Sequence, residues 1–137
     1  MINNAAVFIF KDVVETTDTD WDRILGVNVK GYAFFAKHAI PAMRQRGRGA
    51  IVNTASISGF TAQEGFVPYN VSKGAVMQLT RCMAADHGPE GIRCNMVCPG
   101  FIDTPINKQE ALDLGQTYEE FVRAPVTACQ LPPCCCS

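Results

Sequence analysis

The sequence predicts a single α/β domain built on parallel strands. Three observations lead to this fold class: a length of 137 residues that suits one compact domain, short apolar runs bounded by glycine, serine or proline, and longer segments between them in which apolar residues recur at helical spacing. Strands that alternate with helices in this way are typical of parallel βαβ units. We therefore expect about three parallel strands joined by two long helices.

The first predicted elements are the end of a strand and a long helix. The opening residues, MINN, fit the end of a buried strand that emerges into a loop. Thr17 and Asp18 can cap a helix N-terminus, and RQRGRG ends the helix with basic residues and glycine. The apolar stripe of this helix consists of Trp21, Ile24, Leu25, Tyr32, Phe35, Ala36, Ala39 and Met43.

One polar residue falls on this apolar stripe. Asn28 lies between Leu25 and Tyr32 in the helical pattern. A buried amide that lacks hydrogen-bond partners destabilises the fold by about 1–3 kcal/mol. We therefore expect Asn28 to have a specific partner or role.

A second strand and a second long helix follow. GAIVNTAS, residues 49–56, is short and rich in β-branched residues, which is typical of a strand buried on both faces. Small residues then form a loop, and a helix runs from about Val67 to His87, where Gly88 and Pro89 end it. The apolar side of this helix carries Val71, Ala75, Val76, Leu79 and Met83.

The third strand, IRCNMVCPG at residues 92–100, is broken by Pro99 and Gly100. Two successive right-handed crossovers that move the same way across a sheet place both helices on one face. The other face and the edge of the first strand are then open to water, which favours association or aggregation.

Charge and hydropathy exclude two classes of partner. The chain has 12 Lys and Arg against 13 Asp and Glu, a net charge of -1 and a pI near 6.1, so no basic surface attracts nucleic acid. No apolar run reaches the ~20 residues that span a bilayer, and the N-terminus lacks the basic segment of a signal peptide. We expect a soluble, cytoplasmic protein that binds neither nucleic acid nor membrane.

The seven cysteines do not form an evident framework. An odd count without a secretory signal argues against disulfides. Cys94 and Cys98 share a strand face, but no CxxC or histidine pattern completes a zinc set, so we expect small buried hydrophobic residues and no metal. The terminal CCCS fits a prenylation box poorly, because its middle positions are not aliphatic and no polybasic run precedes it.

Five segments, in order and at matching spacing, resemble the signatures of the short-chain dehydrogenase/reductase family. The resemblance extends over roughly residues 2–106 and implies a partial Rossmann-like, doubly wound fold with two long helices on one face. A lone YxxxK is a weak signal, whereas five ordered motifs are strong evidence. The segments are NNAA (3–6), VNVKG (27–31), IVNTAS (51–56), YNVSK (69–73) and NMVCPGFIDTP (95–105).

The resemblance implies NAD- or NADP-dependent hydride transfer between a secondary alcohol and a ketone. Such a reaction requires an acid or base at the substrate oxygen. Tyrosine with its ordinary pKa of about 10 is mostly protonated. An ammonium one helical turn along, together with the positive nicotinamide ring of the oxidised cofactor, would favour the phenolate and lower that pKa. Tyr69 and Lys73 have the i, i+4 spacing, and Ser56 can orient the substrate through a hydrogen bond. Taken alone, the pair would be an ordinary half-buried aromatic beside a solvated lysine.

The family pattern assigns a role to each of four residues. Tyr69 is the general acid/base, Lys73 holds the nicotinamide ribose and lowers the pKa of Tyr69, and Ser56 orients the substrate. Asn28 anchors a water in a proton relay to Lys73. Ser58 competes with Ser56, but the family places its serine three residues before the glycine that is here Gly59.

The cofactor contacts carry over only in part. Asn4, Ala5 and Ala6 match an Asn-Asn-Ala-Gly stretch near the adenosine side, although Ala6 replaces the usual glycine and its Cβ crowds a close backbone approach. Tyr69 and Lys73 contribute from the long helix. The segment that closes on the nicotinamide carboxamide is represented by Pro99, Gly100, Ile102 and Thr104.

Other parts of the family pattern are missing. The 137 residues contain no GxGxxG phosphate loop and no strand that selects NAD or NADP, so both cofactors stay open. We expect residues 1–122 to form a partial catalytic domain in which 106–122 is a mobile helical lid, and 123–137 to be a proline- and cysteine-biased tail. Two functions are open: an oxidoreductase, or a catalytically inactive fragment that acts as an oligomerisation partner. In either case the two long helices are the expected surface for homo-oligomers.

Overall fold

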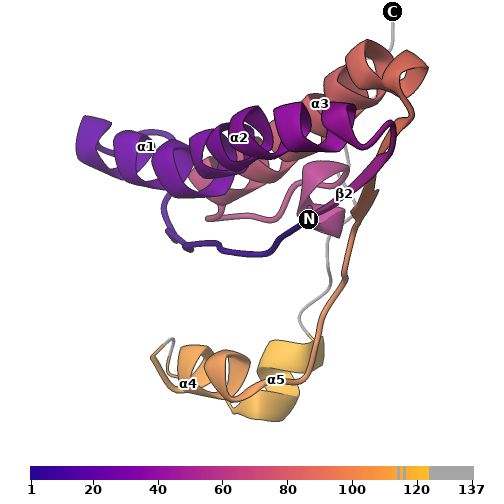
Figure 1. Cartoon of the computed structure of the whole chain (residues 1–137). Coiled ribbons are helices and arrows are strands. Elements are labelled where there is room, and N and C mark those ends of the chain that lie inside the picture. The colour runs from indigo at the N-terminus through magenta and orange to yellow at the C-terminus, as the bar shows by residue number, and fades with distance from the viewer. Residues whose placement is uncertain (114, 116, 124–137) are drawn as a thin grey trace, which may run out of the picture.

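The computed structural model (Figure 1) describes residues 1–113, 115 and 117–123. Helices and strands alternate along the chain, and short 3-10 or π turns (η) join or end several of them. In order, the elements are β1 (Ile2–Asn3), α1 (Asp18–Leu25), η1 (Gly26–Lys30), α2 (Gly31–Gln45), β2 (Gly49–Thr54), η2 (Ile57–Gly59), α3 (Val67–His87), η3 (Gly88–Glu90), β3 (Ile92–Val97), α4 (Pro105–Asp113) and α5 (Tyr118–Arg123).

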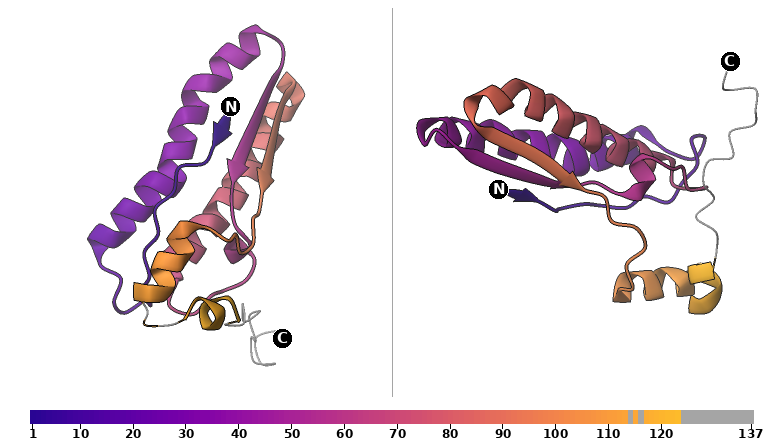
Figure 2. Two further views of the ribbon diagram at one scale, coloured as in Figure 1. Left: turned by 90° about the horizontal axis from the view of Figure 1, so that it is seen from below. Right: turned by 90° about the vertical axis from the view of Figure 1, so that its right-hand side faces the viewer.

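The described strands form one parallel sheet in the order β1-β2-β3. Ile2 pairs with Val52, and β2 pairs with β3 along its whole length from Gly49 opposite Ile92 to Thr54 opposite Val97. The two long helical segments, α1–α2 and α3, lie on one side of this sheet (Figure 2). The predicted fold class, three parallel strands with two long helices on one face, is confirmed.

The main core lies between the sheet and these helices. Ile51, Ile92 and Cys94 point from β2 and β3 toward the helices, and Ile51 and Ile92 are completely buried. Burying a branched aliphatic side chain contributes about 1.5–3 kcal/mol. The side chains that meet them from α2 and α3 are Ala36, Ile40 and Met83.

The opposite face of the sheet is open, as the crossover argument predicts. Ile2, Val52 and Asn95 are aligned by the strand register and share that face. Ile2 is 74% exposed, and Val97 at the end of β3 is exposed as well. β2 is therefore buried on one face only, although its sequence is that of a strand suited to burial on both.

The first long helix differs from the prediction in one respect. Thr17 is the predicted N-cap, with its side chain accepting from the Asp20 N–H, but the helix is then interrupted by the π turn η1. The buried residues of this segment lie four apart, and positions four apart drift by about 40° per step in a regular α-helix. A π turn counters that drift and keeps the inner face aligned. These residues are Ile24, Asn28, Tyr32, Ala36 and Ile40.

Two residues assigned to apolar helix faces are exposed. The bounds of α3 are those predicted, but Val71 is exposed, and so is Phe35 on α2. The buried side of α3 carries the predicted Val76 and Met83. It also carries polar side chains, because each finds a partner: Ser72 with Asn28, Lys73 with Thr54, and Thr80 with Asn53. Hydrophobicity alone therefore identified only part of the buried side.

The cysteines in the described part of the chain are free thiols. Cys94 is buried in the core and Cys98 packs beside it against a second cluster, which confirms the expected hydrophobic role, whereas Cys82 is exposed. Cys129, the CCCS segment and the rest of the 123–137 tail apart from Arg123 lie outside the described residues. Within those residues no helix has the length and apolar character needed to cross a bilayer.

Candidate active site

A cavity of about 440 Å³ lies beyond the carboxyl ends of β2 and β3. Open parallel sheets bind ligands at this end. The cavity is lined by the segment after β1, the loop after β2, the first turns of α3, and the segment after β3. Of the residues that the sequence selects, those that line it are Asn4, Ala6, Ser56, Tyr69, Lys73, Pro99, Gly100, Ile102 and Thr104.

Tyr69 and Ser56 meet in this cavity although one lies on α3 and the other follows β2. Both side chains are 8% exposed and line the same cavity, and the Ser56 hydroxyl lies close enough to the phenol to influence its pKa. Burial raises the pKa of Tyr69 above its ordinary value of 10.0, and the Ser56 hydroxyl lowers it by a smaller amount. In the chain alone, the predicted lowering of the phenol pKa is therefore not observed, because burial is the larger effect.

Lys73 lies one turn further along α3 and is 2% exposed. Its ammonium donates a 2.8 Å hydrogen bond to the backbone carbonyl of Thr54, and its Nζ lies 5.6 Å from the centroid of the Tyr69 ring. Burial lowers the pKa of Lys73 from 10.5 to about 8, because a desolvated ammonium is disfavoured. The Tyr–Lys pair is thus a buried pair rather than an aromatic with a solvated neighbour.

The two candidate serines differ in their contacts. Ser56 caps the turn η2, where its Oγ accepts from the Ser58 N–H at 3.1 Å. The Ser58 hydroxyl donates to Gln63 at 2.9 Å. Both serines line the cavity, but Ser56 is the one that lowers the pKa of Tyr69.

Asn28 is completely buried beneath the site and does not line the cavity. Its Oδ1 accepts from the Val7 N–H at 2.8 Å, and its Nδ2 donates to the Val7 carbonyl and to Ser72 Oγ, both at 3.0 Å. The Ser72 hydroxyl in turn donates to the Tyr69 carbonyl at 2.8 Å. Asn28 therefore joins the segment after β1, the π turn and the start of α3. Its water relay to Lys73 stays a prediction.

Two of the three residues expected near the adenosine side of the cofactor lie at the cavity. Asn4 and Ala6 line the cavity, whereas Ala5 is exposed and does not. An ammonium has three N–H donors, and Thr54 takes one from Lys73. The remaining donors, on a side chain that lines the cavity, suit the hydroxyls of a sugar. The residues present thus fit the nicotinamide-ribose end of a dinucleotide.

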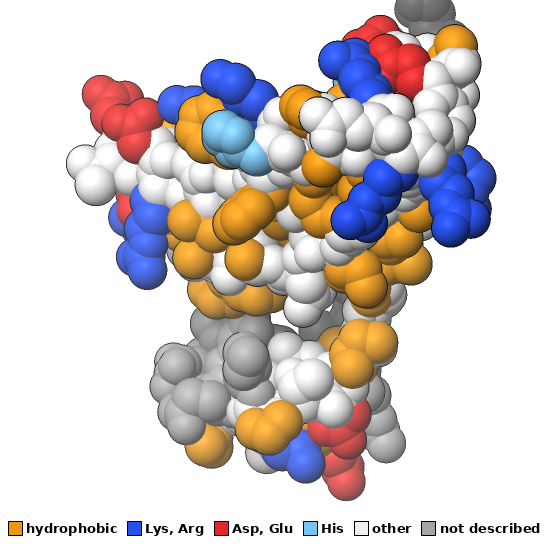
Figure 3. All heavy atoms as spheres, in the orientation of Figure 1, with side chains coloured by type: hydrophobic (Ala, Val, Ile, Leu, Met, Phe, Trp, Pro, Cys, Tyr) orange, Lys and Arg blue, Asp and Glu red, His pale blue; other side chains and the backbone are white. Residues whose placement is uncertain are grey.

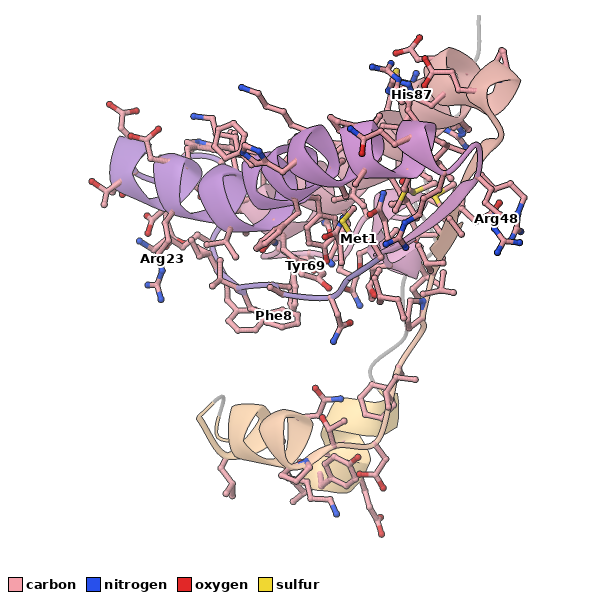
Figure 4. The ribbon with its side chains drawn as sticks, in the orientation of Figure 1. Met1, Phe8, Arg23, Arg48, Tyr69 and His87 are labelled. Carbon is pink, nitrogen blue, oxygen red and sulfur yellow. The ribbon has the colours of Figure 1, made fainter. Side chains whose placement is uncertain are left out.

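Sequence analysis missed several aromatic and polar residues of the cavity. Phe8 stacks on the Tyr69 ring, with centroids 4.6 Å apart and planes at 21°, and Figure 4 shows the two side chains on the side of the helical layer that faces α4. The only local signal for Phe8 was its place two residues after Ala6, which in extended backbone puts both on one side. The other missed lining residues include Phe66, Phe101, Gln63 and Asn107.

The segment expected to act as a lid is helical. It contains α4 and α5, and Thr104 and Asn107 at the start of α4 line the cavity. The Tyr118 hydroxyl donates to Asp103 at 2.7 Å, which joins α5 to the approach to α4. Its mobility stays a prediction. Among residues 1–113, 115 and 117–123, no three His, Cys, Asp or Glu side chains gather as metal ligands.

Comparisons with known proteins match this chain to one protein family. The sequence profile of the short chain dehydrogenase family matches residues 1–115. The chain is 46% identical over 120 residues to meso-2,3-butanediol dehydrogenase of Serratia marcescens, which covers 88% of this chain and 47% of that protein. It is 39% identical over 117 residues to cyclopentanol dehydrogenase of a Comamonas species, covering 85% of this chain and 46% of that protein.

A solved structure agrees with these sequence matches. The crystal structure of a gluconate 5-dehydrogenase from Burkholderia cenocepacia J2315, in complex with NADP and tartrate, superposes with a TM-score of 0.75 at 32% identity. The match covers 79% of this chain and 42% of that one. The chain therefore spans less than half the length of these three proteins.

Proposed function

The chain belongs to the short-chain dehydrogenase family, and from this premise we propose that it supplies the catalytic, nicotinamide-facing half of an oxidoreductase that interconverts a secondary alcohol and a ketone. The observation that carries the proposal is the convergence of Ser56, Tyr69 and Lys73 on one cavity. Relatives named for the alcohols 2,3-butanediol and cyclopentanol support this substrate class.

The three side chains divide the work at the substrate oxygen. Ser56 donates a hydrogen bond that orients this oxygen, and Tyr69 removes its proton during oxidation and returns it during reduction. The nicotinamide, when bound, accepts or supplies the hydride at the carbinol carbon. Loss of the hydroxyl proton to Tyr69 and of the hydride to the nicotinamide would turn the alcohol into the ketone.

Lys73 supports Tyr69 in two ways. Its ammonium lies over the Tyr69 ring, where a positive charge stabilises the phenolate that forms when the proton leaves. Its remaining N–H donors hold the ribose hydroxyls of the cofactor. Asn28 fixes the turn of α3 that carries Tyr69 and, in this proposal, anchors a water that connects Lys73 to solvent.

The cofactor is NAD or NADP. Asn4, Ala5 and Ala6 would lie toward the adenosine side, and the segment after β3 would hold the carboxamide through Pro99, Gly100, Ile102 and Thr104. Structural neighbours carry NADP, which supports a dinucleotide at this site. Because the 137 residues contain no glycine-rich phosphate loop, the chain by itself should bind the cofactor weakly. Residues 1–122 would form the catalytic part, and 123–137 a separate tail.

A second candidate function is an inactive fragment that acts as an oligomerisation partner. The observation that favours it is exposed apolar surface: Phe34 and Phe35 on α2 are 60% and 67% exposed, and Ile2 on the open sheet face is 74% exposed. Large exposed apolar patches mark association surfaces. Homo-oligomers through α2 and α3 are compatible with both candidate functions.

Turnover separates the two functions. The full chain is assayed with a secondary alcohol and excess NAD⁺ or NADP⁺, by the absorbance of the reduced nicotinamide, beside Tyr69→Phe and the control Tyr32→Phe. Tyr32 is buried outside the cavity lining, and its hydroxyl donates a long 3.4 Å hydrogen bond to the Thr54 carbonyl, so its variant controls for the loss of a buried tyrosine hydroxyl beside the site. We expect slow turnover that only Tyr69→Phe abolishes, with nearly unchanged melting temperatures. Equal rates for wild type and Tyr69→Phe, or no turnover at all, would favour the inactive fragment.

A further inference from the structure

The cavity has one wall made of aromatic side chains. Phe8 stacks on Tyr69 at 4.6 Å between ring centroids, and Phe10 meets Phe66 edge-on at 4.6 Å. Phe8 and Phe66 both line the cavity, and Phe8 is 47% exposed. We call Phe8, Phe66 and the Tyr69 ring the aromatic wall. Figure 3 shows hydrophobic side chains gathered along this lower edge of the main body.

The aromatic wall is held from behind by main-chain contacts. Lys11 forms an isolated parallel bridge with Phe66, and the Val67 N–H donates to the Lys11 carbonyl at 3.1 Å. The Lys11 ammonium pairs with Asp20 at 2.7 Å, which ties the same segment to the first turn of α1. Phe8 and Phe66 thus come from segments that are joined to each other and to a helix, so their rings are presented at fixed positions.

The small number of charged side chains in the cavity lining also indicates which ligands the site can take. Among the described side chains that line the cavity, Lys73 is the sole charged one, and its ammonium is almost fully buried and bonded to Thr54. A carboxylate placed against phenyl rings without a cationic partner loses several kcal/mol of hydration. The polar lining groups are hydroxyls and amides such as Ser58, Gln63 and Asn107. Because the single charged group among these described side chains is already bonded to Thr54, the lining favours a neutral ligand over an anion, which would lose hydration against the rings.

We propose that the site takes uncharged alcohols and ketones with an aryl or cycloalkyl group on the carbinol carbon, and that Phe8 is the residue that selects them. This inference rests on the proposed function for the location of the reacting carbon, which lies beside Ser56 and Tyr69. A ring attached to that carbon would continue the stack that Phe8 begins. The cavity volume of about 440 Å³ lies within the roughly 300–1,000 Å³ of small-molecule sites.

Binding of two matched ketones tests the inference without requiring turnover. Acetophenone and 4-acetylbenzoate share a methyl ketone and a phenyl ring and differ by one carboxylate. We titrate each into the full chain, with and without NADP⁺, and follow binding by NMR. We expect acetophenone to bind at least about tenfold more tightly, and Phe8→Ala to weaken acetophenone by about three- to tenfold, the range of a lost aromatic pair.

Two further variants keep the test decisive. Phe34→Ala removes a phenylalanine on α2 that is 60% exposed, against 47% for Phe8, and does not line the cavity, so it should leave binding unchanged. Phe8→Leu keeps apolar volume should Phe8→Ala fail to fold, and it should give a smaller loss in the same direction. Equal affinity for the two ketones, no effect of either Phe8 variant, or no saturable binding in either condition would overturn the inference.

These binding experiments and the turnover assay can fail independently of each other. Phe8-dependent binding of acetophenone in a chain without turnover would leave this inference standing and remove the oxidoreductase. Turnover that depends on Tyr69 but accepts anionic ketones equally well would support the oxidoreductase and overturn this inference.

Discussion

The ammonium of Lys73 donates a 2.8 Å hydrogen bond to the backbone carbonyl of Thr54, the last residue of β2. This contact joins the second turn of α3 to the carboxyl end of the central strand, two residues before Ser56. It therefore sets the position of the helix that carries Tyr69 relative to the loop that carries Ser56. The site therefore contains a buried ammonium, and its burial should change how the free energy of unfolding depends on pH.

Lys73→Met should change how stability depends on pH. Burial lowers the pKa of Lys73 to about 8 from 10.5. Below the lower value both the folded and the unfolded chain carry the proton, so Lys73 adds no pH dependence. Between the two values the unfolded chain retains a proton that the folded chain releases, so the free energy of unfolding rises with pH.

Urea unfolding of wild type and Lys73→Met from about pH 7 to pH 10 measures this effect. The difference between the two proteins should be flat at the acid end and then shift in favour of wild type, approaching about 1.4 kcal/mol per pH unit. Because both proteins share all other titrating groups, their contributions cancel. A difference that stays constant throughout would mean that Lys73 is solvated.

Asn28→Ala should destabilise the fold by about 1–3 kcal/mol, because the Val7 N–H and the Ser72 hydroxyl lose a buried partner. Hydrogen exchange at the Val7 amide should become faster, which reports on this contact specifically. Asn70→Ala is the matched control, since among the described residues the Asn70 Oδ1 has no hydrogen-bond partner and its Nδ2 donates to the Gln63 carbonyl alone. Unchanged protection of Val7 in Asn28→Ala would contradict the contact.

Gly59→Ala and Gly100→Ala should behave differently although both glycines lie near the cavity. A Cβ at Gly59 would meet Met77 Sδ at 2.5 Å and the backbone of Lys73 at 3.1 Å, so the Met77 side chain must move and the α3 backbone must give by a few tenths of an ångström. A Cβ at Gly100 would meet only Ile57 Cδ1, at an ordinary 3.6 Å. We expect Gly59→Ala to lose about 1–3 kcal/mol in thermal or urea unfolding and Gly100→Ala to be nearly neutral. If Gly100→Ala lost more stability than Gly59→Ala, the close packing of α3 against the loop after β2 would be contradicted.

Phe35→Asp should reduce self-association, because it puts a charge on the exposed apolar side of α2. Sedimentation velocity over a range of concentrations measures the change. Val14→Asp serves as a control at a position that is 88% exposed in the loop before α1. If Val14→Asp disperses oligomers and Phe35→Asp does not, the long helices are not the association surface.

Local sequence features predicted most of the fold. The apolar run of β2 and the glycine–proline stop after α3 predicted these elements with nearly correct bounds, because both signals act within a few residues. The π turn was not predicted, since a regular helical period hides a four-residue spacing of buried positions. The inner face of α3 was predicted in part, because Ser72, Lys73 and Thr80 are buried there through partners far away in the chain.

The candidate site was predicted to a similar extent. Motif spacing selected Ser56, Tyr69 and Lys73, which the fold brings to one cavity. Phe8 was missed because its stacking on Tyr69 joins segments 61 residues apart, from position 8 to position 69. In the chain alone, burial raises the pKa of Tyr69, and the sequence gives no measure of this effect because burial follows from the tertiary packing. The lowering expected with the oxidised nicotinamide bound stays a prediction.

The most direct test of the account is the titration of Tyr69 itself, followed by NMR of chains with ¹³C-labelled tyrosine rings. We predict a Tyr69 pKa above the ordinary 10.0 in wild type, a further rise in Ser56→Ala, which loses the hydroxyl that lowers it, and no change in Ser58→Ala. A Tyr69 that titrates at the ordinary value and does not respond to Ser56→Ala would show that the two hydroxyls do not meet.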